Sequence, residues 1–161
     1  SGKGPPGPDQ FGYLVLIGVG NTEKEGYDRV RMIKGYLETT GITSEAFLNP
    51  QGYAPVSVNV AALRRGNRKA IRVETTRDGR PINNATADVP DLIQAGTCFA
   101  GTPDQVFEQI ADFYRYVGGF GHILAMMQGG HLGHDETVKN LTLFSREVLP
   151  RLGELKIDGL S

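Results

Sequence analysis

Three parts of the chain repeat one pattern, in which a short apolar run is followed by a segment with apolar residues at helical spacing. The apolar runs are nearly continuous, as in strands buried on both faces of a sheet, and lie at 13–19, 97–100 and 121–127. The segments that follow predict helices over 22–38, 103–117 and 136–149. Strand–helix units in this order predict an α/β fold whose parallel strands are joined by right-handed crossovers.

Capping residues support the starts of these helices. Thr22 with Glu25, and Thr102 with Gln105, have the spacing of a capping box, in which each side chain bonds a backbone amide near the helix start. Asp135 is expected to cap the third helix. The face of that helix that is expected to be buried carries four apolar residues, Val138, Leu141, Phe144 and Val148.

The stretch 43–87 interrupts the repeated units. It is rich in Pro, Gly and Asn, and it is far longer than the ~4–6 residues that usually connect two elements. A strand is predicted at 56–60, and Asp78-Gly79 predicts a hairpin between 71–76 and 80–83. We interpret 43–87 as a mobile insertion between the first and second units.

The remaining segments complete the predicted domain organisation. One short helix is predicted over 88–96. Residues 1–10 hold three Gly and three Pro and are expected to be a flexible linker, whereas 156–161 is expected to be a tail. The folded unit is therefore expected over 11–155.

Composition and charge narrow the possible classes of function. The chain has 161 residues, 39% of them hydrophobic and 22% charged, which is ordinary for one soluble globular domain. Its formal net charge of −1 does not favour binding to nucleic acid or to an acidic membrane surface, and no apolar run approaches the ~20 residues that span a bilayer. Cys98 is the only cysteine, so no intrachain disulfide can form, and a cytoplasmic location is expected.

Candidate chemistry is expected where the parallel strands end, because sites in such sheets lie at the carboxyl ends of the strands. These ends lie at 18–21, 100–102 and 126–130. Gly18 and Gly20 begin like a dinucleotide-binding fingerprint, but Glu23 stands at the third glycine position and would repel a pyrophosphate, which favours a plain strand-to-helix turn. The adaptable side chains of Met126 and Met127 suit either the wall of a pocket for a flat apolar ligand or plain core.

Several other polar residues favour structural over chemical roles. His131 and His134 lie on a glycine-rich loop without the fixed geometry of metal ligands, so a surface or pocket-rim loop is expected there rather than a metal site. His122 and Cys98 lie within apolar strands and are expected to be core residues. The basic run at 64–72 is expected to be a solvated loop, since no aromatic residues are interleaved with it.

Some strings in the sequence are more specific than a general α/β pattern. They are NTE at 21–23, NPQGY at 49–53, GTP at 101–103, GGFG at 118–121 and LFSREVLP at 143–150. Together with the strand that begins at Phe11, these strings make the chain resemble the C-terminal portion of the bacterial-luciferase-like family of flavin-dependent monooxygenases. The strings near the C-terminus are the most specific ones.

The resemblance implies a TIM-type barrel and chemistry with reduced FMN, or sometimes a deazaflavin, and oxygen. A complete barrel has eight strand–helix units and ~250 residues, so the fold class expected here is a partial TIM-type (β/α) barrel of about three parallel units with a long insertion. The family's catalytic and flavin-phosphate positions have no counterpart in this sequence, so no catalytic residue is assigned. The resemblance offers four residues for a pocket wall, Asn21, Thr102, Met127 and Gln128.

Two functions from different classes are left open by the sequence. The first is the C-terminal part of an FMN-dependent monooxygenase that is inactive without the missing N-terminal half, binds no FMN by itself, and is served by a flavin reductase when complete. The alternative is a non-catalytic half-barrel that acts as an assembly or interaction module. In both cases an open parallel sheet has an uncovered edge and face, which a homodimer is expected to cover.

Overall fold

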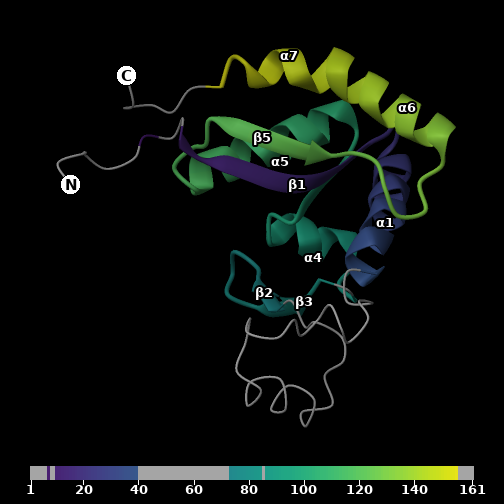
Figure 1. The fold of residues 1–161 in the computed structure, drawn as a ribbon. Helices are drawn as coiled ribbons and strands as arrows, with labels where there is room; N and C mark the ends of the chain where they lie inside the picture. The colour runs from purple at the N-terminus through teal and green to yellow at the C-terminus, as the bar shows by residue number, and fades with distance from the viewer. Residues whose placement is uncertain (1–6, 8–9, 40–72, 85, 156–161) are drawn as a thin grey trace, which may run out of the picture.

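Three parallel strands form the central sheet of the computed structural model, which describes residues 7, 10–39, 73–84 and 86–155 (Figure 1). The strands are β1 (Gly12–Val19), β4 (Cys98–Gly101) and β5 (His122–Met126), and β1 lies between the other two. Leu16 pairs with Cys98 on one side of β1, and Leu14 pairs with Leu124 on the other. The predicted α/β architecture with parallel neighbouring strands is therefore confirmed.

Helices cover both faces of the sheet because the chain first crosses to one side of β1 and then crosses back to the other side. The chain crosses from β1 to β4 through α1 (Glu23–Thr39), and it crosses back past β1 to β5 through α5 (Pro103–Tyr116). Two right-handed crossovers that run in opposite directions place their helices on opposite faces. Val15 and Ile17 accordingly share a core with α5, whereas Leu16 shares a core with α1.

The predicted capping box is present at the start of α5, whereas at α1 Thr22 caps the helix as predicted but Glu25 reaches back to Asn21 N, one residue before the cap. Glu25 N donates to Thr22 Oγ1 at 3.2 Å, and Glu25 Oε2 accepts from the amide of Asn21 at 2.9 Å. At α5, Gln105 N donates to Thr102 Oγ1 at 3.4 Å, and Thr102 N donates to Gln105 Oε1 at 2.9 Å. Each helix therefore begins with a first-turn backbone donor satisfied by the hydroxyl of its threonine.

We expect Thr102→Ala to lower the free energy of unfolding by about 0.5–2 kcal/mol, because the first turn of α5 loses its acceptor. Thr22→Ala is expected to act similarly on α1. Urea denaturation of both variants measures the effect. Unchanged midpoints for both variants would mean that neither hydroxyl contributes to capping in solution.

The C-terminal helical segment starts earlier than the sequence predicts. α6 (His134–Leu143) begins directly after Gly133, which is its N-cap and has no side chain to contribute. Asp135 lies in the first turn and makes no capping bond, so the expected Asp135 cap is wrong. The carboxylate instead lies where the helix dipole favours negative charge.

The buried face of α6 is also different from the predicted one. Val138 and Leu141 are 47% and 45% exposed, whereas Thr137 and Asn140 are buried. The prediction is wrong for these positions because α6 meets the polar ends of the strands, where backbone groups need hydrogen-bond partners. Phe144, farther along, is buried in the apolar core as expected.

A π-helical turn, η2 (Phe144–Val148), separates α6 from α7 (Leu149–Leu152). In this turn Leu149 N donates to Phe144 O, one residue farther back than in an α-helix. Pro150 then lies in the first turn of α7, the part of a helix in which proline is tolerated.

The end of the insertion forms the hairpin that Asp78-Gly79 predicts. β2 (Val73–Thr75) pairs antiparallel with β3 (Pro81–Asn83), and Gly79 adopts a φ of 86° in the turn between them. The predicted short helix is α4 (Val89–Gln94), capped by Asp88. Both predictions are confirmed.

The other predictions on the insertion and the termini fall outside the described residues. These are the strand at 56–60, the basic run at 64–72, the tail at 156–161 and most of the linker at 1–10. Within the described part of the chain, none of the helices has the length and apolar character that crossing a bilayer requires.

Tyr13 links the sheet to the α4 side of the molecule. Its hydroxyl donates to Gly96 O at 2.5 Å, and its ring lies against Phe113 with 4.6 Å between centroids. Burial, together with the negative charge of Glu74, raises the pKa of Tyr13 to about 12. The protonated phenol is therefore part of the native contact.

The raised pKa of Tyr13 predicts a loss of stability at high pH. A pKa that is higher in the folded chain than its ordinary value of 10.0 stabilises the fold below pH 10, and this contribution is lost as the pH rises towards about 12. The urea midpoint should fall more steeply across this interval in the wild type than in Tyr13→Phe. If the urea midpoints of the wild type and Tyr13→Phe fell equally steeply with pH, Tyr13 would have the same pKa in the folded and the unfolded chain.

Candidate functional site

The carboxyl ends of the three strands meet at one edge of the sheet, which we call the carboxyl edge. Gly20 N donates to Gly101 O at 2.9 Å and joins the ends of β1 and β4. β5 pairs with β1 only as far as Leu16, so the last residues of β1 have no strand beside them on that side. In open α/β sheets, ligands bind at such a point, where the chain leaves two neighbouring strands towards opposite faces.

Asn140 fills the space between the ends of β1 and β5. Its side chain is fully buried; Nδ2 donates to Ile17 O at 2.9 Å and to Met127 O at 3.0 Å. Its Oδ1 accepts from Val19 N at 2.7 Å. The amide therefore takes the place of a neighbouring strand for the end of β1, and the crevice is closed by the protein itself.

Arg29 closes the same region from the α1 side. Its side chain is 5% exposed, and the guanidinium donates to Val19 O and, at 2.8 Å, to Glu136 Oε2. Glu136 also accepts from Lys139 at 2.7 Å. The bonds from Lys139 and Arg29 hold the pKa of Glu136 below its ordinary value. The buried guanidinium is thus neutralised within the chain and is not free for an external anion.

The four residues predicted for a pocket wall fall into two pairs. Asn21 and Thr102 stand at the ends of β1 and β4, where Gln105 Nε2 donates to Glu23 Oε1 at 3.1 Å and connects the two turns. Met127 and Gln128 follow β5 and line a groove. The structure does not bring all four residues together.

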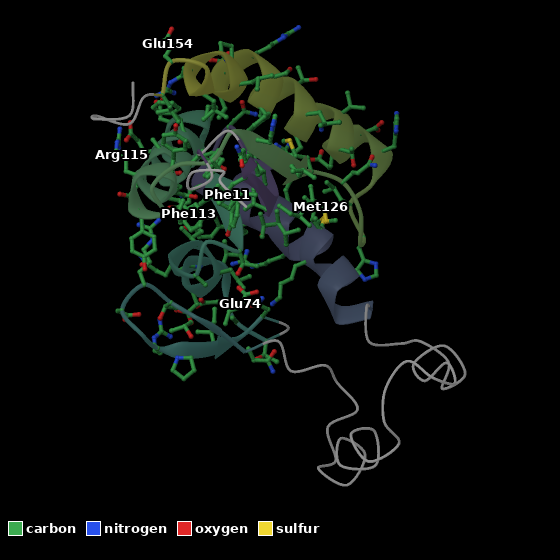
Figure 2. All side chains as sticks on the ribbon, turned by 60° about the vertical axis from the view of Figure 1, so that its left-hand side comes forward. Phe11, Glu74, Phe113, Arg115, Met126 and Glu154 are labelled. Atoms are coloured by element: carbon green, nitrogen blue, oxygen red, sulfur yellow. The ribbon has the colours of Figure 1, made fainter. Side chains whose placement is uncertain are left out.

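This groove, which we call the β5 groove, has a volume of about 760 Å³. Its apolar lining includes Leu14, Leu124, Met126, Met127 and Leu132, and its polar lining includes Gln128, His134 and Thr137. Met126 lies at the end of β5, packed against the core that α1 shares with the sheet (Figure 2). A wide apolar surface with a few polar groups at one end suits a flat, largely apolar ligand.

The histidines and the cysteine occupy different environments. His122 is exposed at the first residue of the edge strand β5, so its prediction as a core residue is wrong. Cys98 is fully buried, as predicted, and burial raises the pKa of its thiol to about 12. Across the described ranges, no group of three or more His, Cys, Asp or Glu side chains has the arrangement of a metal site.

Sequence reasoning missed the polar residues that shape the carboxyl edge. Asn140 and Arg29 are buried, although residues of these types usually lie on the surface. A signal for Asn140 exists in the sequence, because Thr137, Asn140 and Phe144 form a stripe at helical spacing. That stripe is recognisable only when polar residues are allowed on a buried face.

Comparison with known proteins supports the fold. No family model and no curated protein matches the sequence. Among solved structures, the monooxygenase RslO1 from Streptomyces bottropensis matches with 16% identity and a TM-score of 0.50, over 92% of this chain and 32% of that one. The oxygenating constituent of 3,6-diketocamphane monooxygenase from the CAM plasmid of Pseudomonas putida, a type II Baeyer–Villiger monooxygenase in complex with FMN, matches with 19% identity and a TM-score of 0.44, over 91% and 34%.

The chain spans about a third of the length of these two solved structures. At this level of identity the match to the first of them establishes likeness of fold. The mixed α/β architecture, with its parallel sheet and helices, is consistent with a partial TIM-type barrel.

Proposed function

We propose that this chain is the C-terminal part of a luciferase-like, FMN-dependent monooxygenase of the cytoplasm, and that it is inactive without the N-terminal part of the barrel. The observation that carries the proposal is the likeness of fold to a monooxygenase over 92% of the chain, which covers only 32% of that enzyme. The family resemblance of residues 11–155 supports the same assignment.

The residues at the carboxyl edge do not fit the phosphate of FMN. Phosphates are commonly held by backbone amides at a helix N-terminus. Here the capping side chains Thr22 and Thr102 already bond amides of the first turns, and Glu23 and Asp104 add negative charge beside them. A phosphate would meet repulsion at both helix starts. We therefore assign the flavin phosphate to the part of the enzyme outside this chain.

The β5 groove is the part of this chain that we assign to the complete active site. FMN, when bound, supplies the redox chemistry with oxygen. Leu14, Leu124 and Met126 would contribute an apolar wall that excludes water from the bound flavin. In this arrangement, Gln128 would place a polar group at the end of the wall.

The proposal is tested by titrating FMN into the purified chain and following flavin fluorescence, with a flavin reductase and oxygen present for turnover. We expect neither micromolar FMN binding nor product formation from the chain alone. The longest product of its reading frame is then tested in the same way, and FMN binding by that product is expected to weaken with Leu124→Lys. Turnover by the short chain, or a longer product that binds no FMN, would overturn the proposal.

The uncovered face of the sheet favours a second candidate function. Leu14 and Leu124 are 62% and 54% exposed side by side, as in a surface that docks another protein. A non-catalytic half-barrel that serves as an assembly module would have such a surface. The assembly module predicts a colourless oligomer both for this chain alone and for the longest product of its reading frame. The monooxygenase predicts bound FMN in the longer product.

A further inference from the structure

The strand β4 lies at one edge of the sheet, with β1 on its inner side. Gly101 O accepts from Gly20 N on this inner side, so the backbone groups of Ala100, one residue earlier, point to the outer side by alternation. In the part of the chain that the structure describes, no strand pairs with β4 there. Ala100 is fully buried, so its N–H and C=O groups need a partner other than water.

The side chain of Gln109, on α5, takes the place of a strand on this outer side. Its Oε1 accepts from Ala100 N, and its Nε2 donates to Ala100 O, both at 2.9 Å. A neighbouring parallel strand offers the same two partners, one carbonyl oxygen and one N–H group. The glutamine amide therefore supplies, at one position, the hydrogen bonds of a strand.

Apart from its place at the edge, β4 resembles an interior strand. All four of its residues are buried. Ala100 lies in the core that α1 and α4 share with the sheet, and Phe99 lies in the core of α5. The sequence of β4, CFAG, contains neither a charged residue nor a proline, which are common protections of an edge strand. Burial on both faces is typical of parallel strands that have a neighbour on each side.

We propose that Gln109 holds the place of a strand that lies outside this chain. When the N-terminal part of the protein is present, one of its strands pairs parallel with β4 and takes over Ala100 N and Ala100 O, and the side chain of Gln109 is released. The inference rests on the proposed function, because a closed barrel leaves no strand without a neighbour on either side. About two thirds of the matched monooxygenase lies outside the part that this chain covers, and it can supply the strand.

The exchange of partners is nearly balanced in hydrogen bonds. Ala100 N and Ala100 O keep one partner each, and the released amide of Gln109, which is only half-buried, can bond water. The amide of Asn140 differs, because it is fully buried and bonds backbone groups at the ends of two strands that are already neighbours. Asn140 therefore fills a permanent gap in the sheet, whereas Gln109 fills one that the complete protein closes.

Hydrogen exchange of the Ala100 amide tests the proposal in this chain and in the longest product of its reading frame. In this chain, Gln109→Ala is expected to raise the exchange rate of Ala100 N about 10–100-fold, because the amide loses its acceptor. In the longer product the same substitution should leave the rate unchanged, since a strand carbonyl is the acceptor there. The amide of Gly20, which bonds Gly101 O, is the reference and should keep its rate in both.

Two further variants support the comparison. Gln109→Glu keeps an acceptor for Ala100 N and loses the donor to Ala100 O, so it should raise the exchange rate less than Gln109→Ala and serves if the alanine variant does not fold. Gln105→Ala is the matched control on the same helix. Its bonds to Thr102 N and Glu23 lie at the start of α5, so it should lower the urea midpoint at both lengths, whereas Gln109→Ala should lower it only in this chain.

The possible outcomes separate this inference from the proposed function. Faster exchange of Ala100 N at both lengths would mean that Gln109 caps the edge permanently, and unchanged exchange at both would mean that its bonds do not form in solution; either result overturns the inference. FMN binding by the longer product is measured in parallel. A longer product that binds FMN but loses protection of Ala100 N in Gln109→Ala retains the monooxygenase assignment alone. One that keeps the protection without binding FMN retains the strand pairing alone.

Discussion

Replacing Asn140 with alanine is expected to lower the free energy of unfolding by about 3–5 kcal/mol. The amide is fully buried and bonds three backbone groups, those of Ile17, Val19 and Met127. Alanine would leave all three without a partner in the interior, and the cost of each unpaired buried group is about 1–3 kcal/mol. The urea midpoint measures the loss.

Two further variants separate hydrogen bonding from loss of volume. Asn140→Asp keeps the size and the acceptor for Val19 N, but a carboxylate cannot donate to Ile17 O or Met127 O. This substitution should be strongly destabilising at neutral pH. Stability should recover partly in acid, because the protonated carboxyl group can donate one hydrogen bond. The control, Asn21→Ala, removes an exposed amide whose bond to Glu25 Oε2 is 3.4 Å long and should change stability by less than about 0.5 kcal/mol. A mild effect of Asn140→Ala would mean that water replaces the amide.

Local signals explain how much of the fold the sequence predicts. The apolar runs, the two threonine caps and Asp78-Gly79 are each decided by residues within a few positions of one another, and the structure confirms them. The order of the strands is not a local property. The right-handed rule determines on which face a helix lies once the direction in which the chain moves across the sheet is known. It does not determine on which side of β1 the strand β5 pairs.

The candidate site is predicted less completely for a related physical reason. Met127 and Gln128 could be placed at a strand end from the apolar run before them. The closing of the carboxyl edge by Arg29 and Asn140 depends on unpaired backbone groups that arise only when β5 diverges from β1. The β5 groove, likewise, exists because α1 and α4 cover one part of a face and leave Leu14 and Leu124 open.

Gly26→Ala is expected to destabilise the protein by about 2–4 kcal/mol, although alanine is the better helix former by about 1 kcal/mol. A Cβ at Gly26 would lie 2.4 Å from Gly101 N and 2.6 Å from Gly101 O. The obstacle is backbone, which cannot turn aside as a side chain can. Gly101 is further fixed by the bond from Gly20 N at 2.9 Å, so relief of the clash would have to separate β4 from the end of β1.

The matched control lies in the same helix. A Cβ at Gly35 would meet the ring of His131 at 2.9 Å, and this exposed side chain can move away. Gly35→Ala should therefore be neutral or stabilising by up to about 1 kcal/mol, since only the gain in helix propensity remains. The two substitutions differ in sign because one glycine meets backbone and the other a side chain. If both variants were stabilised alike, the close contact between α1 and β4 at Gly101 would not exist in solution.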